Sequence, residues 1–171
     1  MIVAITGHRP HKLLGEWDMK GPVSRAVRAQ LRRLLEELVP ERAISGMALG
    51  VDMIFAEEAL DLGIPVTAAV PFEGQEARWN PGQQLVYKKI LAHPLVERVV
   101  CAQGGPEHAN HKFQNRNRWL VDHCGLLVAV WDGTSGGTRN AVLYAREVGR
   151  PIIRIRPTRI DRLEWVREEA A

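Results

Sequence analysis

The sequence predicts an α/β fold, in which a doubly wound, mainly parallel sheet of five to six strands carries helices on both faces. Short apolar runs of strand length alternate with amphipathic stretches of helical length along almost the whole chain, as expected for a parallel sheet covered on both sides. With 171 residues, 46% of them hydrophobic, the chain has the size of one domain with one core. We place this domain at residues 1–156 and treat residues 157–171 as a charged extension that packs on it or frays from it.

Each element has a local signal. Residues 1–6 are apolar and β-branched, and Gly7 ends this first strand. From Pro22 to Leu38 apolar residues recur at helical spacing, and Pro40 suits the stop of this helix. A short second strand is predicted in the stretch that begins at Arg42, and further strands are predicted at residues 64–70, 95–101, 126–131 and 151–155. The further helices carry apolar residues on one side, at residues 53–62, 81–93, 113–123 and 138–148.

Charge and cysteine content restrict the classes of partner. Lys and Arg exceed Asp and Glu by only 23 to 20, a surplus that permits anionic ligands and gives little support to a nucleic-acid partner. The arginines between residues 25 and 33 could grip nucleic acid, but such residues usually form a solvated helix face. Cys101 and Cys124 lie too far apart for a metal or disulfide pattern. No apolar run reaches the ~20 residues of a membrane span, so we expect a cytoplasmic protein without a membrane partner.

The strongest candidate site begins at Gly125, where an apolar strand runs into a glycine-dense turn and then a helix start. The N-terminus of a helix at the carboxyl edge of a parallel sheet leaves backbone N–H groups that can hold an anion. We interpret this stretch as half of a phosphate or nucleotide pocket. Its candidate ligand-binding residues are Asp132, Gly133, Ser135, Gly136, Gly137, Thr138 and Asn140.

Two other junctions can contribute to this pocket. Gly7, His8 and Arg9 follow the first strand, where they form either a simple turn or a ligand contact with Arg9 as a cationic fork for phosphate. Ser45, Gly46 and Gly50 bracket the next turn, whose backbone can approach a ligand closely because two positions lack a Cβ atom. Asp52, near a helix start, either complements the helix dipole or accepts hydrogen bonds from a ribose.

Aromatic and planar polar residues supply further candidates. Phe72 and Trp79 could stack on a base whose edge Gln75 reads, or they could cap the core. Arg116 and Asn117 could clamp phosphate or ribose, or belong to a solvated helix face. A metal site at His108 and His111 is disfavoured because no further ligand completes it, so we predict no metal.

Several motifs, taken in order, resemble a known superfamily. They are Thr6-Gly-His-Arg-Pro10, Ser45-Gly-Met-Ala-Leu-Gly-Val-Asp52, Ala69-Val-Pro-Phe72 with Gln75, Glu76 and Trp79, Arg116-Asn117 with Val121-Asp122, and Trp131-Asp-Gly-Thr-Ser-Gly-Gly-Thr138. Over residues 1 to about 156 their order and spacing are similar to the SLOG superfamily. The nearest branch is YpsA-like and is related to the DNA-processing protein DprA and the lonely-guy phosphoribohydrolases.

The resemblance implies a Rossmann-like domain whose glycine loops bind a nucleotide or nucleotide-derived ligand. It makes Gly136, Gly137 and Thr138 the phosphate-facing loop, with the Ser45 to Asp52 turn as the opposing wall. The lonely-guy hydrolases and the similar nucleoside deoxyribosyltransferases carry a glutamate shortly after the glycine-threonine pair. This chain has Asn140 and its neighbours there, and asparagine cannot act as nucleophile or base.

The leading hypothesis is therefore a module that binds or senses a nucleotide-like small molecule, and the sequence indicates no certain cofactor besides this ligand. The alternative is an enzyme that hydrolyses or transfers the N-glycosidic bond of nucleosides or nucleoside monophosphates, with Asp52, Glu73 or Asp132 as the candidate carboxylate. A third hypothesis is DprA-like binding of single-stranded DNA, which requires a basic patch. Folds of this kind commonly pair through helices, so a homo-oligomer is a further expectation, although the sequence shows no unmistakable apolar patch.

Overall fold

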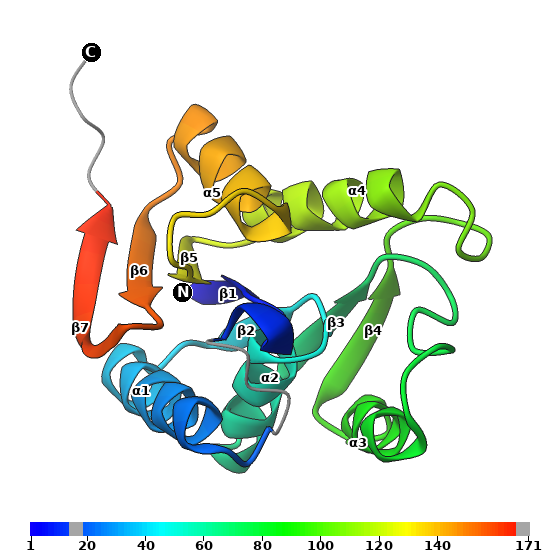
Figure 1. The fold of residues 1–171 in the computed structure, drawn as a ribbon, viewed down its shortest axis with the longest axis horizontal. Coiled ribbons are helices and arrows are strands. Elements are labelled where there is room, and N and C mark those ends of the chain that lie inside the picture. Colours follow the sequence, from blue (N-terminus) through cyan, green and yellow to red (C-terminus); the bar gives the residue numbers. More distant parts are fainter. Residues whose placement is uncertain (14–18, 167–171) are drawn as a thin grey trace.

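A computed structural model describes residues 1–13 and 19–166, with side chains described as far as Arg159. Its centre is one sheet in the order β4-β3-β2-β1-β5-β6-β7 (Figure 1). The strands are β1 (Ile2–Gly7), β2 (Arg42–Ser45), β3 (Val66–Val70), β4 (Val96–Val100), β5 (Leu126–Val130), β6 (Ile152–Arg156) and β7 (Arg159–Val166). Strands β1 to β6 are mutually parallel. The predicted Rossmann-like, mainly parallel α/β fold is confirmed.

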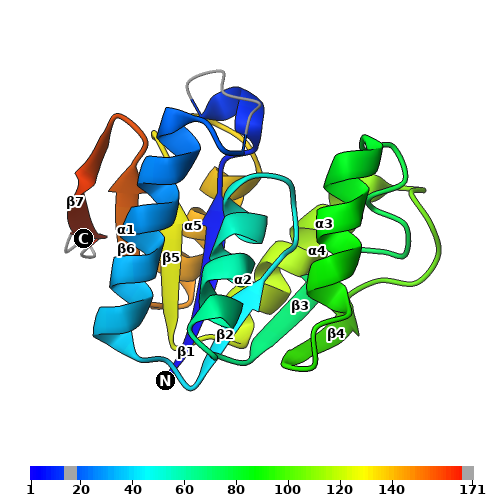
Figure 2. The ribbon, with the colours of Figure 1, turned by 90° about the horizontal axis from the view of Figure 1, so that it is seen from below.

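The helices cover both faces of the sheet. They are α1 (Pro22–Leu38), α2 (Val51–Asp61), α3 (Pro81–Leu91), α4 (Ala109–Asp122) and α5 (Gly137–Glu147), with a short 3₁₀ turn η1 (Pro10–Lys12) after β1. Figures 1 and 2 show α1, α2 and α3 on one face and α4 and α5 on the other. Each helix group buries its apolar stripe against the sheet, which produces a larger core under α1 to α3 and a smaller one under α4 and α5.

The order of the strands determines where a ligand can bind. Successive strands run outward from β1 through β2, β3 and β4 on one side, and the chain then returns to place β5 on the other side of β1. Since β1 and β5 pair directly, from Val3 with Leu126 to Gly7 with Val130, their carboxyl ends lie side by side. This is the topological switch point, outside which open α/β sheets bind ligands.

The C-terminal extension contains a seventh strand that the sequence analysis did not predict. Strand β7 pairs antiparallel with β6, with Ile152 opposite Val166 and Ile155 opposite Leu163, and so forms one edge of the sheet. The expectation that the chain end frays concerns residues 167–171, which lie outside the described range. Among the helices of the described residues, none is long and apolar enough to cross a membrane.

Candidate functional site

A cavity of about 500 Å³ opens at the carboxyl ends of β1 and β5, within the ~300–1,000 Å³ range of small-molecule sites. Four segments line it: the β1 end with η1, the start of α2, the inner side of α4, and the loop from β5 into α5. We call it the inner cavity. Its predicted site residues are Gly7, His8, Arg9, Asp52, Arg116, Asn117, Ser135, Gly136, Gly137, Thr138 and Asn140.

The start of α5 forms one wall of the inner cavity. Gly136 is the N-cap residue with φ at +142°, a backbone conformation that favours glycine. Gly137 and Thr138 form the first turn of the helix, where backbone N–H groups lack partners within the helix. Asn117 of α4 donates from Nδ2 to the Gly137 carbonyl oxygen at 3.2 Å, which fixes this turn relative to α4. The geometry is that of an anion site at a helix N-terminus.

A buried ion pair forms the opposite wall. Arg116 and Asp52 are 5% and 4% exposed, and Nη1 of Arg116 lies 3.7 Å from Oδ2 of Asp52. Burial raises the pKa of the Asp52 carboxyl, although the positive charge of Arg116 and a hydrogen bond from the Ala48 N–H oppose this shift. Burial likewise lowers the pKa of Arg116, and the Asp52 carboxylate counteracts that change. Each charge therefore compensates the other, and loss of either would leave an unpaired buried charge.

The turn after β2 holds this pair in place. Arg116 donates from Nη1 to the Gly46 carbonyl oxygen and from Nε to Oδ1 of Asn117, the latter at 2.9 Å. Ser45 is fully buried and bonds through its hydroxyl to the Asp52 carbonyl oxygen at 2.7 Å. A Cβ atom on Gly46 would lie 1.9 Å from Nη1 of Arg116. Glycine is thus required here to admit the guanidinium.

A second polar cluster joins the two loops at the cavity mouth. The buried His8 ring lies with Nε2 at 2.7 Å from Oδ1 of Asp132. The same carboxylate oxygen accepts hydrogen bonds from the Thr134 N–H at 2.8 Å and the Thr134 hydroxyl at 2.6 Å. Partial burial raises the pKa of Asp132, but these donors outweigh it and hold the pKa at about 2. Burial lowers the pKa of His8, against the effect of Asp132.

Positive charge predominates among the side chains that line the inner cavity. Arg9, Lys12 and Arg116 face a single carboxylate, that of Asp52. Lys12 donates from Nζ to the Ser135 carbonyl oxygen at 2.6 Å and so connects η1 to the β5–α5 loop. Arg9 forms no ion pair among the described residues and lies with Cζ 5.2 Å from the Phe113 ring centroid. Two cations beyond the buried pair are therefore available to an anionic ligand.

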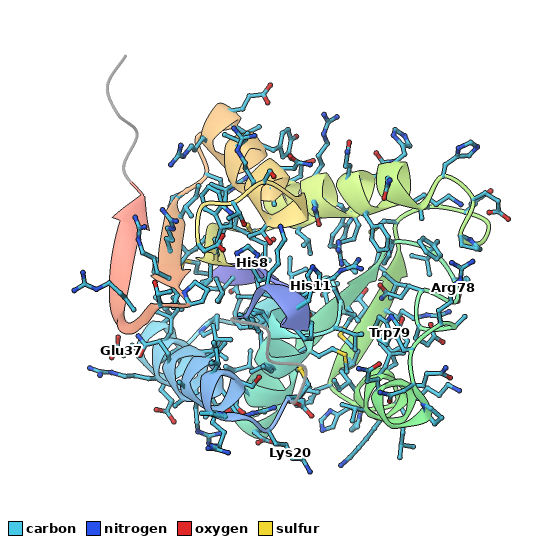
Figure 3. The ribbon with its side chains drawn as sticks, viewed as in Figure 1. His8, His11, Lys20, Glu37, Arg78 and Trp79 are labelled. Carbon is cyan, nitrogen blue, oxygen red and sulfur yellow. The ribbon has the colours of Figure 1, made fainter. Side chains whose placement is uncertain are left out.

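The predicted aromatic residues lie in a separate hollow. Phe72, Gln75 and Trp79, together with Glu73, line a cavity of about 1020 Å³ between the β3–α3 loop and the N-terminal part of α4, which we call the outer hollow. Figure 3 shows Arg78 and Trp79 on the α3 side of the molecule, away from His8 and His11. Phe72 is buried and packs edge-on against Phe113, and Trp79 packs edge-on against Tyr87.

The remaining predicted residues lie behind the inner cavity. Ser45, Gly46 and Gly50 support its wall without lining it, and Asp132 and Gly133 lie in the adjoining turn. Gly50 has φ at +95°, and a Cβ atom there would lie 2.9 Å from the His8 carbonyl oxygen. A Cβ atom on Gly7 would lie 2.4 Å from Val51. These glycines permit close packing of β1 against α2.

Several lining residues were not predicted. They are Thr6, His11, Lys12, Ala48, Asn110, Phe113, Gln114 and Thr134. The signal that could have identified Lys12 is its position shortly after the Thr6 to Pro10 motif, at the carboxyl end of β1. Among the described residues, no group of three or more His, Cys, Asp or Glu side chains has the geometry to hold a metal ion.

Comparison with known proteins identifies relatives of this chain. A sequence model of the YspA SLOG family matches residues 3–148. The SPbeta prophage-derived protein YoqJ of Bacillus subtilis is 30% identical over 158 residues, which cover 81% of this chain and 92% of that protein.

Solved structures show the same fold. The DNA processing protein DprA of Streptococcus pneumoniae superposes with a TM-score of 0.63 at 22% identity, covering 90% of this chain and 49% of that one. The chain therefore spans about half the length of the pneumococcal protein. A molybdenum cofactor binding protein of Rippkaea orientalis has a TM-score of 0.56 at 18% identity and covers 91% of this chain and 76% of that one.

Proposed function

From the premise that this chain belongs to the YspA SLOG family, we propose that it binds a nucleotide or nucleotide-derived small molecule in the inner cavity. The observation that carries the proposal is the convergence, at the switch point of the sheet, of the α5 N-terminus with the cations Arg9 and Lys12. An anion held there meets unpaired backbone N–H groups and two positive side chains together. Phosphate is the common nucleotide group with this chemistry.

The side of the inner cavity formed by α4 suits the sugar and base. Asn117 lines the cavity with a side-chain amide that already donates to the Gly137 carbonyl oxygen, and Asn110 and Gln114 add further amides from the same helix. Phe113 lies between them and presents an aromatic ring beside the guanidinium of Arg9. Sites for heterocyclic ligands usually combine aromatic side chains, which pack on the ring, with a few polar groups such as amides, which form hydrogen bonds to its edge.

Binding without turnover is favoured by the state of the carboxylates. Of the three candidates, only Asp52 lines the inner cavity. Its carboxylate accepts a hydrogen bond from the Ala48 N–H and compensates the positive charge of Arg116. Asp132 is engaged by His8 and Thr134, and Glu73 lies in the outer hollow, paired with Arg98. Since Asn140 lines the cavity near the start of α5, no carboxylate of that helix is placed to assist displacement at an anomeric carbon.

Titration calorimetry with a panel of nucleoside mono-, di- and triphosphates tests the proposal. The decisive variant is Gly137→Leu, because a Cβ atom at Gly137 makes only an ordinary contact, 3.6 Å from Nδ2 of Asn117. The leucine side chain would fill the anion site without disturbing the fold. We expect at least a tenfold loss of affinity, which is about 1.4 kcal/mol.

Gly82→Leu is the matched control. Gly82 also lies in the first turn of a helix, α3, and a Cβ atom there would be 3.4 Å from its nearest neighbour, but it lines neither cavity. Its affinity should equal that of the natural protein. Unchanged affinity in Gly137→Leu would contradict the site assignment. Chromatography of each incubated nucleotide for released base separates binding from N-glycosidic cleavage, because a binding protein returns its ligand intact.

A further inference from the structure

The inner cavity and the outer hollow are neighbours that share part of their lining. Arg9, His11, Ala48 and Phe113 line both. At about 500 Å³ and 1020 Å³, the two spaces together exceed the ~1,000 Å³ upper end of the usual range for small-molecule sites. A single mononucleotide would occupy the first and leave the second empty.

The two spaces differ in charge. The inner cavity has three cationic side chains against one carboxylate. In the outer hollow, apart from the shared Arg9, the charged side chains are Arg78, Glu73 and Glu107. Both carboxylates are already paired, Glu73 with Arg98 and Glu107 with Lys112, so the hollow presents less unpaired charge than the inner cavity. The same hollow is bordered by the aromatic residues Phe72, Trp79 and Phe113, which suit an uncharged planar group.

Arg9 and Phe113 lie at the boundary between the inner cavity and the outer hollow. Arg9 is exposed, forms no ion pair among the described residues and stacks beside Phe113, which itself lies between the two spaces. A ligand that extended from the inner cavity into the outer hollow would place the linkage between its two parts beside this guanidinium. Planar guanidinium groups match phosphate geometry and its negative charge.

We propose that the protein binds a ligand of two linked parts: a phosphate-bearing nucleoside in the inner cavity and a second, uncharged heterocycle in the outer hollow, joined by a phosphate linkage at Arg9. The ligand class is thus a dinucleotide or a nucleotide conjugate of similar size. This inference rests on the proposed function, since it extends the same site outward.

The test compares nucleoside monophosphates with the corresponding dinucleotides, joined by a pyrophosphate or a phosphodiester, in titration calorimetry. In the natural protein a dinucleotide should bind at least tenfold more tightly than its monophosphate. The variant Ala77→Trp places an indole in the outer hollow from an exposed position on its lining. It should abolish this gain and leave monophosphate affinity unchanged. Ala29→Trp, on the exposed side of α1, is the matched control and should retain the gain.

A spectroscopic measurement avoids dependence on the folding of Ala77→Trp. The indole N–H signal of Trp79 in a ¹⁵N correlation spectrum, assigned by its loss in Trp79→Phe, should shift with a dinucleotide and stay in place with a monophosphate. Equal affinities of mono- and dinucleotides, or an unmoved Trp79 signal, would overturn the two-part ligand while leaving the proposed function intact.

Two other outcomes also overturn the inference of a two-part ligand. Absence of binding by every nucleotide would overturn the proposed function together with this inference. Tighter binding of a ten-nucleotide single strand than of any dinucleotide, with strong salt dependence, would assign the two compartments to a nucleic-acid strand instead.

Discussion

Gly46, behind one wall of the inner cavity, and Gly137, in another wall, are expected to respond very differently to the same substitution. A Cβ atom added at Gly46 would lie 1.9 Å from Nη1 and 2.5 Å from Cζ of Arg116, and 2.8 Å from Oδ2 of Asp52. To reach an ordinary van der Waals separation the guanidinium would have to move by about 1.5 Å. Arg116 is held by the Gly46 carbonyl oxygen, Asn117 and Asp52. The shift would therefore break bonds to a buried charge.

The cost can be worked from its two components. Overpacking of a filled interior costs about 1–3 kcal/mol, and a lost hydrogen bond to a charged group costs about 1.5–3 kcal/mol. We therefore expect Gly46→Ala to lower the free energy of unfolding by about 3–5 kcal/mol, a large part of the ~5–15 kcal/mol of a typical domain. For a chain of this length the midpoint of thermal unfolding should fall by roughly 6–20 °C.

Gly137→Ala is the matched substitution on the other wall. The added Cβ atom would lie 3.6 Å from Nδ2 of Asn117, an ordinary contact, so its effect on unfolding should stay within about 0.5 kcal/mol. Urea unfolding followed by circular dichroism measures both variants under one set of conditions. If Gly46→Ala unfolds at the same urea concentration as Gly137→Ala, the close approach of Arg116 to Gly46 is wrong.

Two further predictions concern stability. The pKa of the Asp132 carboxyl is held at about 2, against an ordinary 3.8. The ionised carboxylate therefore stabilises the fold above pH ~3.8, and this stabilisation is lost as the pH falls through ~2. Because 33% of the side chain is exposed, we expect its contribution to the free energy of unfolding to be about 1 kcal/mol. Asp132→Asn should remove this part of the acid dependence in urea unfolding at pH 5 and pH 2, and an unchanged difference would refute it. Glu58→Gln should cost about 1–3 kcal/mol, because the buried carboxylate pairs with Arg28 and Arg32. Glu37→Gln, which breaks only an exposed pair within α1 (Figure 3), should cost below ~0.5 kcal/mol, and equal effects would contradict the distinction.

Periodicity sufficed to predict the parallel sheet because its signals are local. Strands β1, β3 and β5 are mostly apolar runs, whereas β4 and β6 also carry charged residues. The helices between the strands pack apolar residues against the sheet. Strand β7 escaped detection because its residues alternate charged and apolar types within a segment already interpreted as an extension. Its pairing with β6 is a tertiary contact with no counterpart in the local pattern.

The candidate site was predictable only in part, because contacts between segments far apart in the sequence leave no local signal. Glycine-rich junctions mark the carboxyl ends of β1 and β5, so the residues on either side of the switch point were identifiable. The ion pair of Asp52 with Arg116 joins positions on different helices, and nothing in their spacing indicates that they meet. Phe72 and Trp79 follow a strand end, as ligand contacts do, but β3 is two strands away from β1 in the sheet. Their hollow is therefore displaced from the inner cavity.

The basic residues around the inner cavity fall into two groups, one that holds the cavity wall in place and one at the mouth that can attract an anionic ligand. Arg116 is compensated by Asp52 and held by three partners, so its charge is committed to the wall that it forms. Arg9 and Lys12 lie at the mouth, where Lys12 donates to the Ser135 carbonyl oxygen and Arg9 lies beside the Phe113 ring. Substitutions at the wall should therefore change stability first. Loss of the exposed Arg9 charge should weaken binding of an anion while the fold persists, because an exposed cation contributes little to folding and much to attracting a phosphate.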